Sequence, residues 1–162
     1  MTESGAAKFL ADSMLGSLAR WLRIMGYDTK YDKNMADVDL AIMAKLESRA
    51  ILTRDRELAR APNAFLVESD VLDEQLSAVA EKYGLGFRES ETRCSGCNGE
   101  LIDTPKGEVM GKVPDGAFSN NDKFWRCASC GKLFWKGSHW IGITERLERL
   151  SLSGSRDRED AR

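Results

Sequence analysis

The sequence of 162 residues has no long hydrophobic run, and no apolar segment approaches the roughly 20 residues that a membrane-spanning helix needs. Its N-terminus also lacks the basic segment and hydrophobic stretch that a secretion signal would show. Acidic and basic residues nearly balance, with a formal net charge of -2, so no general positive field favours a polyanionic partner. We therefore expect no membrane partner, and any contact with nucleic acid must be local.

Cysteine is scarce, and all four cysteines fall into two Cys-x-x-Cys pairs, Cys94 with Cys97 and Cys127 with Cys130. Each pair can direct two thiolates at one ion, and two such pairs complete a tetrahedral shell. We therefore predict a structural zinc site. Two alternatives use the same residues: an iron site, which also takes paired thiolates, and two disulfide bonds in a secreted module. Since no secretion signal is visible, we expect a metal protein of the reducing cytoplasm.

The first half of the chain alternates short apolar segments with amphipathic ones. Strands that alternate with helices indicate βαβ units and a mostly parallel sheet, so the predicted fold class is α/β. The expected strands are residues 8–11, 29–31, 50–53 and 65–67, and the expected helices are 14–25, 38–46 and 72–82, with a helical turn at 56–60.

The composition changes near residues 84–93, where two glycines and a charged stretch interrupt the apolar periodicity. Beyond this point glycines, turns and aromatic residues surround the cysteines, as expected for a small β-rich ribbon folded on its metal. The predicted parts are an α/β domain at residues 7–86, a ribbon at 90–142, a terminal helix at 143–150 and a charged, disordered tail at 151–162.

Three aspartates, Asp12, Asp37 and Asp55, lie where predicted strands give way to helices. The carboxyl ends of parallel strands meet at one edge of a sheet, so these side chains can converge on one crevice. Grouped carboxylates repel one another unless a cation joins them, and oxygen ligands suit Mg²⁺ or Mn²⁺. Such an ion could activate water to hydrolyse a phosphodiester bond. The alternative is that each aspartate only caps a helix, which is common at these positions.

The predicted ribbon interleaves basic side chains with aromatic rings. Because lysine neutralises phosphate and an aromatic face stacks on an unpaired base, this pattern fits single-stranded RNA. A small ribbon also needs aromatic side chains to cover its metal core, and Phe134 and Trp135 are expected to pack in that way. The basic residues expected to contact RNA here are Lys112, Lys132 and Lys136.

Three arginines and the only histidine complete the candidate RNA contacts. Arg20 and Arg23 are expected on the face of the first helix opposite its apolar stripe, and Arg54 precedes Asp55. Their guanidinium groups could hold phosphates or pair with nearby acids. His139 is expected to form a hydrogen bond or to face the substrate, because four cysteines already fill a tetrahedral shell.

Several segments, in order, resemble the Mut7-C ribonuclease family, which has a PIN-like nuclease domain followed by a zinc ribbon. The resemblance covers roughly residues 8–145. The segments that carry it are FLADSMLGSLARWLR at residues 9–23, GYDT at 26–29, LTRDREL at 52–58, EQL at 74–76, RCSGCN at 93–98 and FWKGSH at 134–139.

The resemblance implies a PIN-like fold and RNA cleavage that depends on Mg²⁺ or Mn²⁺ at Asp12, Asp37 and Asp55. In relatives the second acidic position looks like a doublet, whereas this chain reads Ala-Asp-Val-Asp at residues 36–39, so Asp39 is an alternative second ligand. The predicted function is a metal-dependent endoribonuclease whose zinc ribbon aids RNA binding. The alternative is a non-catalytic RNA-binding or ribosome-associated module.

Overall fold

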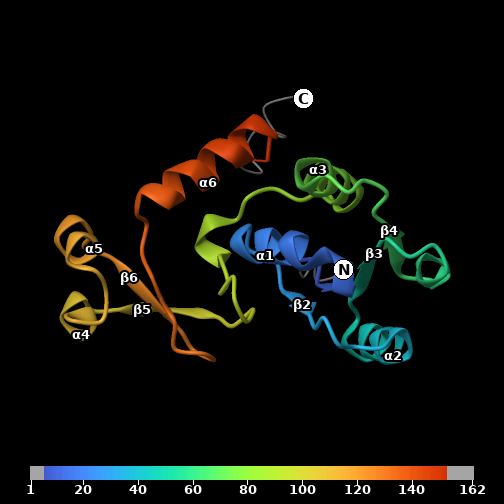
Figure 1. Ribbon diagram of the computed structural model, residues 1–162, viewed down its shortest axis with the longest axis horizontal. Coiled ribbons are helices and arrows are strands. Elements are labelled where there is room, and N and C mark those ends of the chain that lie inside the picture. The colour runs from blue at the N-terminus through green and yellow to red at the C-terminus, as the bar shows by residue number, and fades with distance from the viewer. Residues whose placement is uncertain (1–5, 153–162) are drawn as a thin grey trace, which may run out of the picture.

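The computed structural model describes residues 6–152, and this part of the chain contains a parallel sheet of four strands and an antiparallel sheet of three (Figure 1). Figure 1 shows the two sheets on opposite sides of the molecule, with α6 running from the antiparallel sheet back towards α3. The predicted α/β class and the small β-rich second part are therefore confirmed.

The parallel sheet has the strand order β2-β1-β3-β4. In its register Ala11 pairs with Leu52, so β1 and β3 end side by side. The strands are β1 (Phe9–Ala11), β2 (Thr29–Tyr31), β3 (Ala50–Thr53) and β4 (Ala64–Leu66), and the helices that connect or follow them are α1 (Gly16–Ile24), α2 (Asp37–Glu47) and α3 (Leu72–Tyr83).

Side chains of β1 alternate between the two faces of the parallel sheet. Phe9 and Ala11 belong to a larger core with residues of α1 and α3, whereas Leu10 belongs to a smaller core with Leu40 and Ala44 of α2. Strands that are apolar on both faces are typical of a parallel sheet covered by helices on both sides. In β1 and β3 the polar side chains therefore lie at the strand ends and in the loops that follow them.

The antiparallel sheet has the order β5-β6-β7 and carries its own small core of Val109, Val113 and Phe124. Its strands are β5 (Leu101–Thr104), β6 (Phe124–Cys127) and β7 (Leu133–Phe134), with two short helices, α4 (Lys106–Val109) and α5 (Asp115–Asn120), between β5 and β6. We call residues 93–137, which hold this sheet and the four cysteines, the ribbon.

Helix α6 (Ser138–Arg149) begins five residues before the predicted terminal helix, inside the segment assigned to the ribbon. Its first turn includes Trp140, whose ring contacts Phe87 at a centroid distance of 5.8 Å, and this contact stabilises the earlier start. Neither α6 nor any other helix in the part of the chain described is long and apolar enough to cross a membrane.

Leu152, which the prediction placed in a disordered tail, is part of the ordered structure. Leu152 is 5% exposed and belongs to the larger core, and its backbone carbonyl accepts a hydrogen bond from the N–H of Phe87 at 2.7 Å. The charged composition of residues 151–162 predicted a solvent-exposed tail. A single apolar side chain directly after an amphipathic helix can nevertheless pack into the core beside that helix. The rest of the predicted tail, residues 153–162, lies outside the described residues.

Candidate active site and metal centre

Asp12 and Asp55 lie at the carboxyl ends of the neighbouring strands β1 and β3. Asp12 is 6% exposed, and its Oδ2 accepts a hydrogen bond from Thr53 Oγ1 at 2.7 Å. Thr53 Oγ1 in turn accepts a hydrogen bond from the backbone N–H of Asp55 at 2.9 Å. The last side chain of β3 thus links the two aspartates that the sequence places 43 positions apart.

Both carboxylates also stabilise the turns that follow them. Oδ1 of Asp12 accepts a hydrogen bond from the N–H of Ser13, as the N-cap of the 3₁₀ turn Ser13–Leu15. Oδ1 of the exposed Asp55 accepts hydrogen bonds from the N–H groups of Glu57 and Leu58, at 2.7 and 3.3 Å. The capping roles expected as the alternative are therefore present at these two positions.

Asp37 and Asp39 lie in the first turn of α2, and both are exposed. Ala36, not Asp37, occupies the N-cap position, and no side chain caps this helix. Within residues 6–152, the four cysteines are the only group of three or more acidic, cysteine or histidine side chains whose ligand atoms all lie within 4.8 Å. The structure thus links Asp12 to Asp55 and leaves both candidates for the second ligand on the surface at the start of α2.

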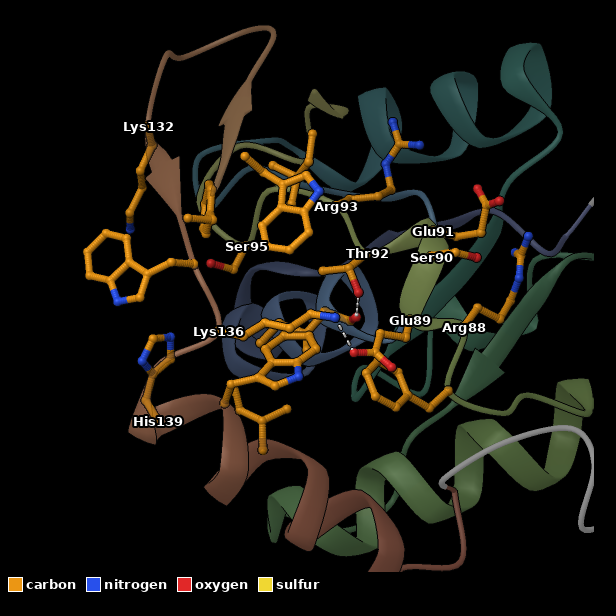
Figure 2. A pocket seen from close by; sticks show the side chains of 18 of the residues that line it. Arg88, Glu89, Ser90, Glu91, Thr92, Arg93, Ser95, Lys132, Lys136 and His139 are labelled. Carbon is orange, nitrogen blue, oxygen red and sulfur yellow. Dashed lines mark hydrogen bonds and ion pairs between the residues drawn. The ribbon is translucent and has the colours of Figure 1, made fainter. Parts of the chain in front are cut away.

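A cavity of about 980 Å³ lies where α1, the 3₁₀ turn Glu89–Glu91, the ribbon and the start of α6 meet (Figure 2). We call this cavity the junction pocket. It gathers four of the seven predicted RNA-binding residues together with indole rings, and the residues most relevant to its chemistry are Arg20, Trp125, Lys132, Lys136, His139 and Trp140.

The other three predicted RNA contacts lie elsewhere. Lys112 is exposed, but it does not line the junction pocket. Arg54 is half-buried, and one of its Nη atoms donates to the backbone carbonyl of Glu68 at 3.2 Å. Arg23 is only 6% exposed, so its expected position on the exposed face of the first helix is wrong. Its guanidinium donates hydrogen bonds to the backbone carbonyls of Thr29 in β2 and of Ser95 in the ribbon, and these bonds compensate for its burial.

The four cysteines come from the loop before β5 and from the end of β6 with the turn that follows it. Their sulfur atoms all lie within 4.8 Å of one another, with Sγ distances of 3.8 Å from Cys94 to Cys130 and 3.4 Å from Cys97 to Cys127. Four sulfurs at about 2.3 Å from a tetrahedral zinc ion would be about 3.8 Å apart. All four cysteines are free, so the arrangement fits a metal ion and not a pair of disulfide bonds.

The surroundings of the cluster shift the pKa values of two of its thiols in opposite directions. Burial raises the pKa of Cys97 to about 12. Burial also acts against the thiolate of Cys127, but backbone N–H groups of Ser129 and Cys130 donate to its Sγ at 3.4 Å each, so its pKa falls to about 6. A dication bound among the sulfurs would favour the thiolate form of all four. The four cysteine sulfurs could therefore hold a zinc ion.

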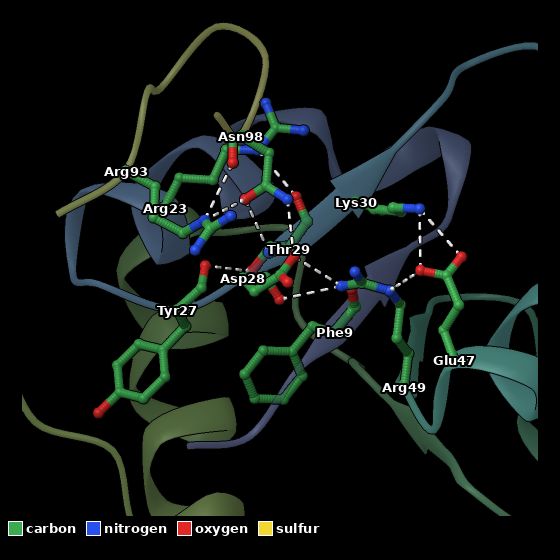
Figure 3. A network of polar contacts seen from close by, with 10 residues as sticks. All are labelled: Phe9, Arg23, Tyr27, Asp28, Thr29, Lys30, Glu47, Arg49, Arg93 and Asn98. Carbon is green, nitrogen blue, oxygen red and sulfur yellow. Dashed lines mark hydrogen bonds and ion pairs between the residues drawn. The ribbon is translucent and has the colours of Figure 1, made fainter. Parts of the chain in front are cut away.

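A network of buried polar contacts fastens the first cysteine pair to the parallel sheet (Figure 3). Asn98, one residue after Cys97, has a positive φ of 73° and points its amide at the start of β2. Its Oδ1 accepts a hydrogen bond from the N–H of Thr29 at 3.0 Å, and its Nδ2 donates to Asp28 Oδ1 at 2.7 Å. The metal centre is therefore joined to the sheet by an amide side chain.

Two arginines extend this network on either side of Asp28. Arg49 is 4% exposed and donates to Asp28 Oδ1 at 2.8 Å, while Arg23 donates to the carbonyls of Thr29 and Ser95 at 2.8 and 3.0 Å. Burial opposes ionisation of Asp28, but the hydrogen bonds from Arg49 and Asn98 outweigh it and lower the pKa of this carboxyl. We call Arg23, Asp28, Thr29, Arg49 and Asn98 the sheet–ribbon clamp. Of these five residues the sequence predicted a functional role for Arg23 alone, as an RNA contact.

Replacing Asn98 with alanine is expected to lower the free energy of unfolding of the zinc-loaded protein by about 2–4 kcal/mol. The change leaves the N–H of Thr29 and one bond of Asp28 without a partner, and it puts alanine at a φ that asparagine tolerates better. Urea unfolding followed by tryptophan fluorescence measures it. The matched control Asn120→Ala, at an exposed position of α5, should change stability by less than about 0.5 kcal/mol. Equal unfolding midpoints for the two variants would show that the clamp adds nothing to stability.

The family model described as the Mut7-C RNAse domain matches residues 7–147, from just before β1 to near the end of α6. No curated protein and no solved structure gives a significant match. The family match spans the aspartates at the strand ends, the junction pocket and all four cysteines. The chain therefore belongs to the Mut7-C RNAse domain family.

Proposed function

We propose that this chain is an endoribonuclease that hydrolyses RNA phosphodiester bonds with the help of Mg²⁺ or Mn²⁺. The observation that carries the proposal is the placement of Asp12 and Asp55 at the ends of adjacent parallel strands, linked through Thr53. The carboxyl ends of the strands of a parallel sheet are the usual place for a ligand site. The family match supports RNA as the substrate, and a PIN-like arrangement of the parallel sheet is part of the proposal.

The side chains at this edge have distinct tasks in the proposed reaction. Thr53 donates to Oδ2 of Asp12 and the N–H of Ser13 donates to Oδ1, so both oxygens are held in place and each keeps a lone pair for a cation. Asp55 is exposed and could bind a cation, or a water molecule, from solvent. Asp37, with Asp39 as the alternative, would supply a third carboxylate from the start of α2. When bound, the divalent ion would polarise the scissile phosphate and lower the pKa of an attacking water.

The ribbon has a supporting role in this proposal. Zinc, in preference to iron, would occupy the four-cysteine centre and stabilise the loop that carries Asn98. The exposed cations Lys112, Lys132 and Lys136, together with Arg20, Arg54 and His139, would then contribute to RNA affinity. A colourless purified protein with one equivalent of zinc would agree with this assignment, whereas a coloured protein would indicate iron.

A second candidate function is a non-catalytic RNA-binding module, and one observation favours it. Asp12 and Asp55 already accept hydrogen bonds from the backbone at the turns that follow them, and helix capping alone would explain their presence. In that case the junction pocket would bind RNA and the strand ends would carry no reaction.

Cleavage of RNA with added Mg²⁺ or Mn²⁺ distinguishes the two functions. We expect the zinc-loaded protein to cut at least one member of a panel of single-stranded and structured RNAs when either ion is present. Cleavage should stop when the added ion is omitted while zinc is retained. Denaturing gels measure the products. If no member of the panel is cut with either ion, but RNA is still bound, the binding-module function replaces the proposal.

A further inference from the structure

The junction pocket has the chemistry of a binding site at a distance from the aspartates. Its rings are only partly buried, although indole side chains are normally placed where they can be covered. Trp135 packs on Phe124 of the ribbon core, and Trp140 packs on Phe87. Trp125 contacts neither of these rings, and Figure 2 shows indole side chains beside Lys132 and Lys136 in the pocket.

Lys136 shows that a cation fits beside these rings. Its ammonium lies 5.4 Å from the ring centroid of Trp125 and 5.5 Å from that of Trp140, and it forms an ion pair with Glu89. Figure 2 shows this pair crossing the pocket. A nucleobase that stacks on Trp125 must take the place of this ammonium. Lys136 is exposed, so its flexible side chain can leave the ring face to a base.

The charges in the pocket are arranged in a way that would orient such a ligand. Arg20 and Lys132 are exposed, and neither side chain forms a hydrogen bond or an ion pair within the part of the chain that the structure describes. Lys132 lies 5.5 Å from the ring centroid of Phe134, a contact that leaves its charge without an acidic partner. Cations without an acidic partner favour phosphates. Glu89, Glu91 and Asp103 also line the pocket, and carboxylates there would repel a phosphate but accept a hydrogen bond from the amino group of a base.

We propose that the junction pocket binds one unpaired nucleotide of single-stranded RNA, with its base against Trp125 and its phosphates near Arg20 and Lys132. This inference deepens the proposed function, because it rests on RNA as the substrate and names the single-stranded form. A base in a duplex is stacked between its neighbours and cannot lie against a protein ring, so the pocket selects unpaired RNA.

The position of the pocket relative to the aspartates agrees with this assignment. Arg20 lies on α1 eight positions after Asp12, which is roughly 12 Å at the rise of a helix. Ser13, Ser17 and Arg20 are exposed and follow one another at helical spacing. Exposed polar side chains on the 3₁₀ turn Ser13–Leu15 and on α1 therefore lead from the strand ends to the pocket, and an RNA strand held in the pocket can extend along them.

The test measures RNA binding in a chain that does not cut its ligand. The zinc-loaded Asp12→Asn protein is titrated with a short labelled oligoribonucleotide, either unpaired or annealed to its complement, and binding is followed by fluorescence anisotropy. We expect the unpaired strand to bind at least about tenfold more tightly than the duplex. Adding Trp125→Ala should weaken binding of the unpaired strand roughly tenfold, which is the usual effect of losing one stacked base.

Two further variants keep the test decisive. Lys132→Ala should weaken binding and reduce the slope of log affinity against log salt by about 0.7, whether or not Trp125→Ala folds. The matched control Lys123→Ala, an exposed ribbon lysine that does not line the pocket, should stay within about twofold of the parent affinity. Equal affinity for duplex and unpaired RNA, or parent affinity in both Trp125→Ala and Lys132→Ala, would overturn the proposal.

Failure of this inference can be told apart from failure of the proposed function. If the parent protein cuts RNA but the two pocket variants bind as the parent does, the pocket is not the anchor, while the nuclease remains. If binding depends on the pocket but the parent never cuts RNA, the pocket assignment holds and the binding-module function is correct.

Discussion

The Asp12→Asn protein should cleave RNA at least about 100-fold more slowly than the parent with saturating Mg²⁺ or Mn²⁺. Asparagine has nearly the same shape as aspartate but lacks the negative charge that recruits the cation. A loss of about 3 kcal/mol in transition-state stabilisation would produce this ratio. Initial rates on the RNA that the parent cuts best provide the measurement, and Asp55→Asn should behave in the same way.

The fold of this variant should be preserved, which separates catalysis from capping. An asparagine oxygen can accept the hydrogen bond from Ser13, and the hydroxyl of Thr53 can rotate to accept from the new amide. Thermal unfolding should therefore match the parent within a few degrees. Asp70→Asn, at an exposed position beyond β4, serves as the control and should keep full activity. Cleavage by Asp12→Asn at the parent rate would place the reaction elsewhere and leave Asp12 as a cap.

Replacing Cys94 and Cys127 together with serine should release the metal and unfold the ribbon. Structural zinc supplies about 10–16 kcal/mol to small zinc-binding domains at neutral pH, far more than the short ribbon core could replace. Zinc content by mass spectrometry should fall from one equivalent to none, and the near-ultraviolet circular dichroism of the ribbon tryptophans should be lost.

The same double variant should also weaken the parallel sheet without unfolding it. The sheet keeps its own core, but the clamp loses the fixed positions of Ser95 and Asn98, which contact Arg23, Asp28 and Thr29. We expect a lower melting temperature for the remaining transition. Ser129→Ala, which keeps all four thiols and the backbone donor to Cys127, should bind zinc normally. Retention of one zinc by the double variant would refute the four-cysteine site.

Much of the fold follows from local sequence patterns, whose boundaries the structure shifts by a few residues. Strands β2 and β3 have the predicted bounds, and α3 differs by one residue, because apolar spacing and the flanking breakers mark them clearly. The prediction missed the first turn of α6 because the residues of that turn have no strong helix propensity. Contact of Trp140 with Phe87 stabilises that turn, and a pairing between positions 53 residues apart is not visible in a local pattern.

The candidate site was predictable to the extent that its chemistry is local. The spacing of the cysteines alone indicated their cluster, and the strand ends indicated Asp12 and Asp55. The clamp was missed because Asp28, Arg49 and Asn98 are ordinary polar residues whose partners lie 21 and 70 positions apart. Arg23 was placed on the wrong face because an arginine can be buried when carbonyl oxygens surround its guanidinium.

Leu147 and Leu152, which follow the ribbon in the chain, are buried in the larger core of the sheet domain. The ribbon is therefore not a module simply appended to the end of that domain. The chain leaves the sheet domain after Leu85, forms the ribbon, and returns through α6 to complete the core it left. The ribbon therefore lies between two segments of the chain that share one core. A simple C-terminal deletion would therefore remove part of the core that supports the aspartates, and exchange of the ribbon for another loop would leave Arg23 and Asp28 without their contacts to Ser95 and Asn98.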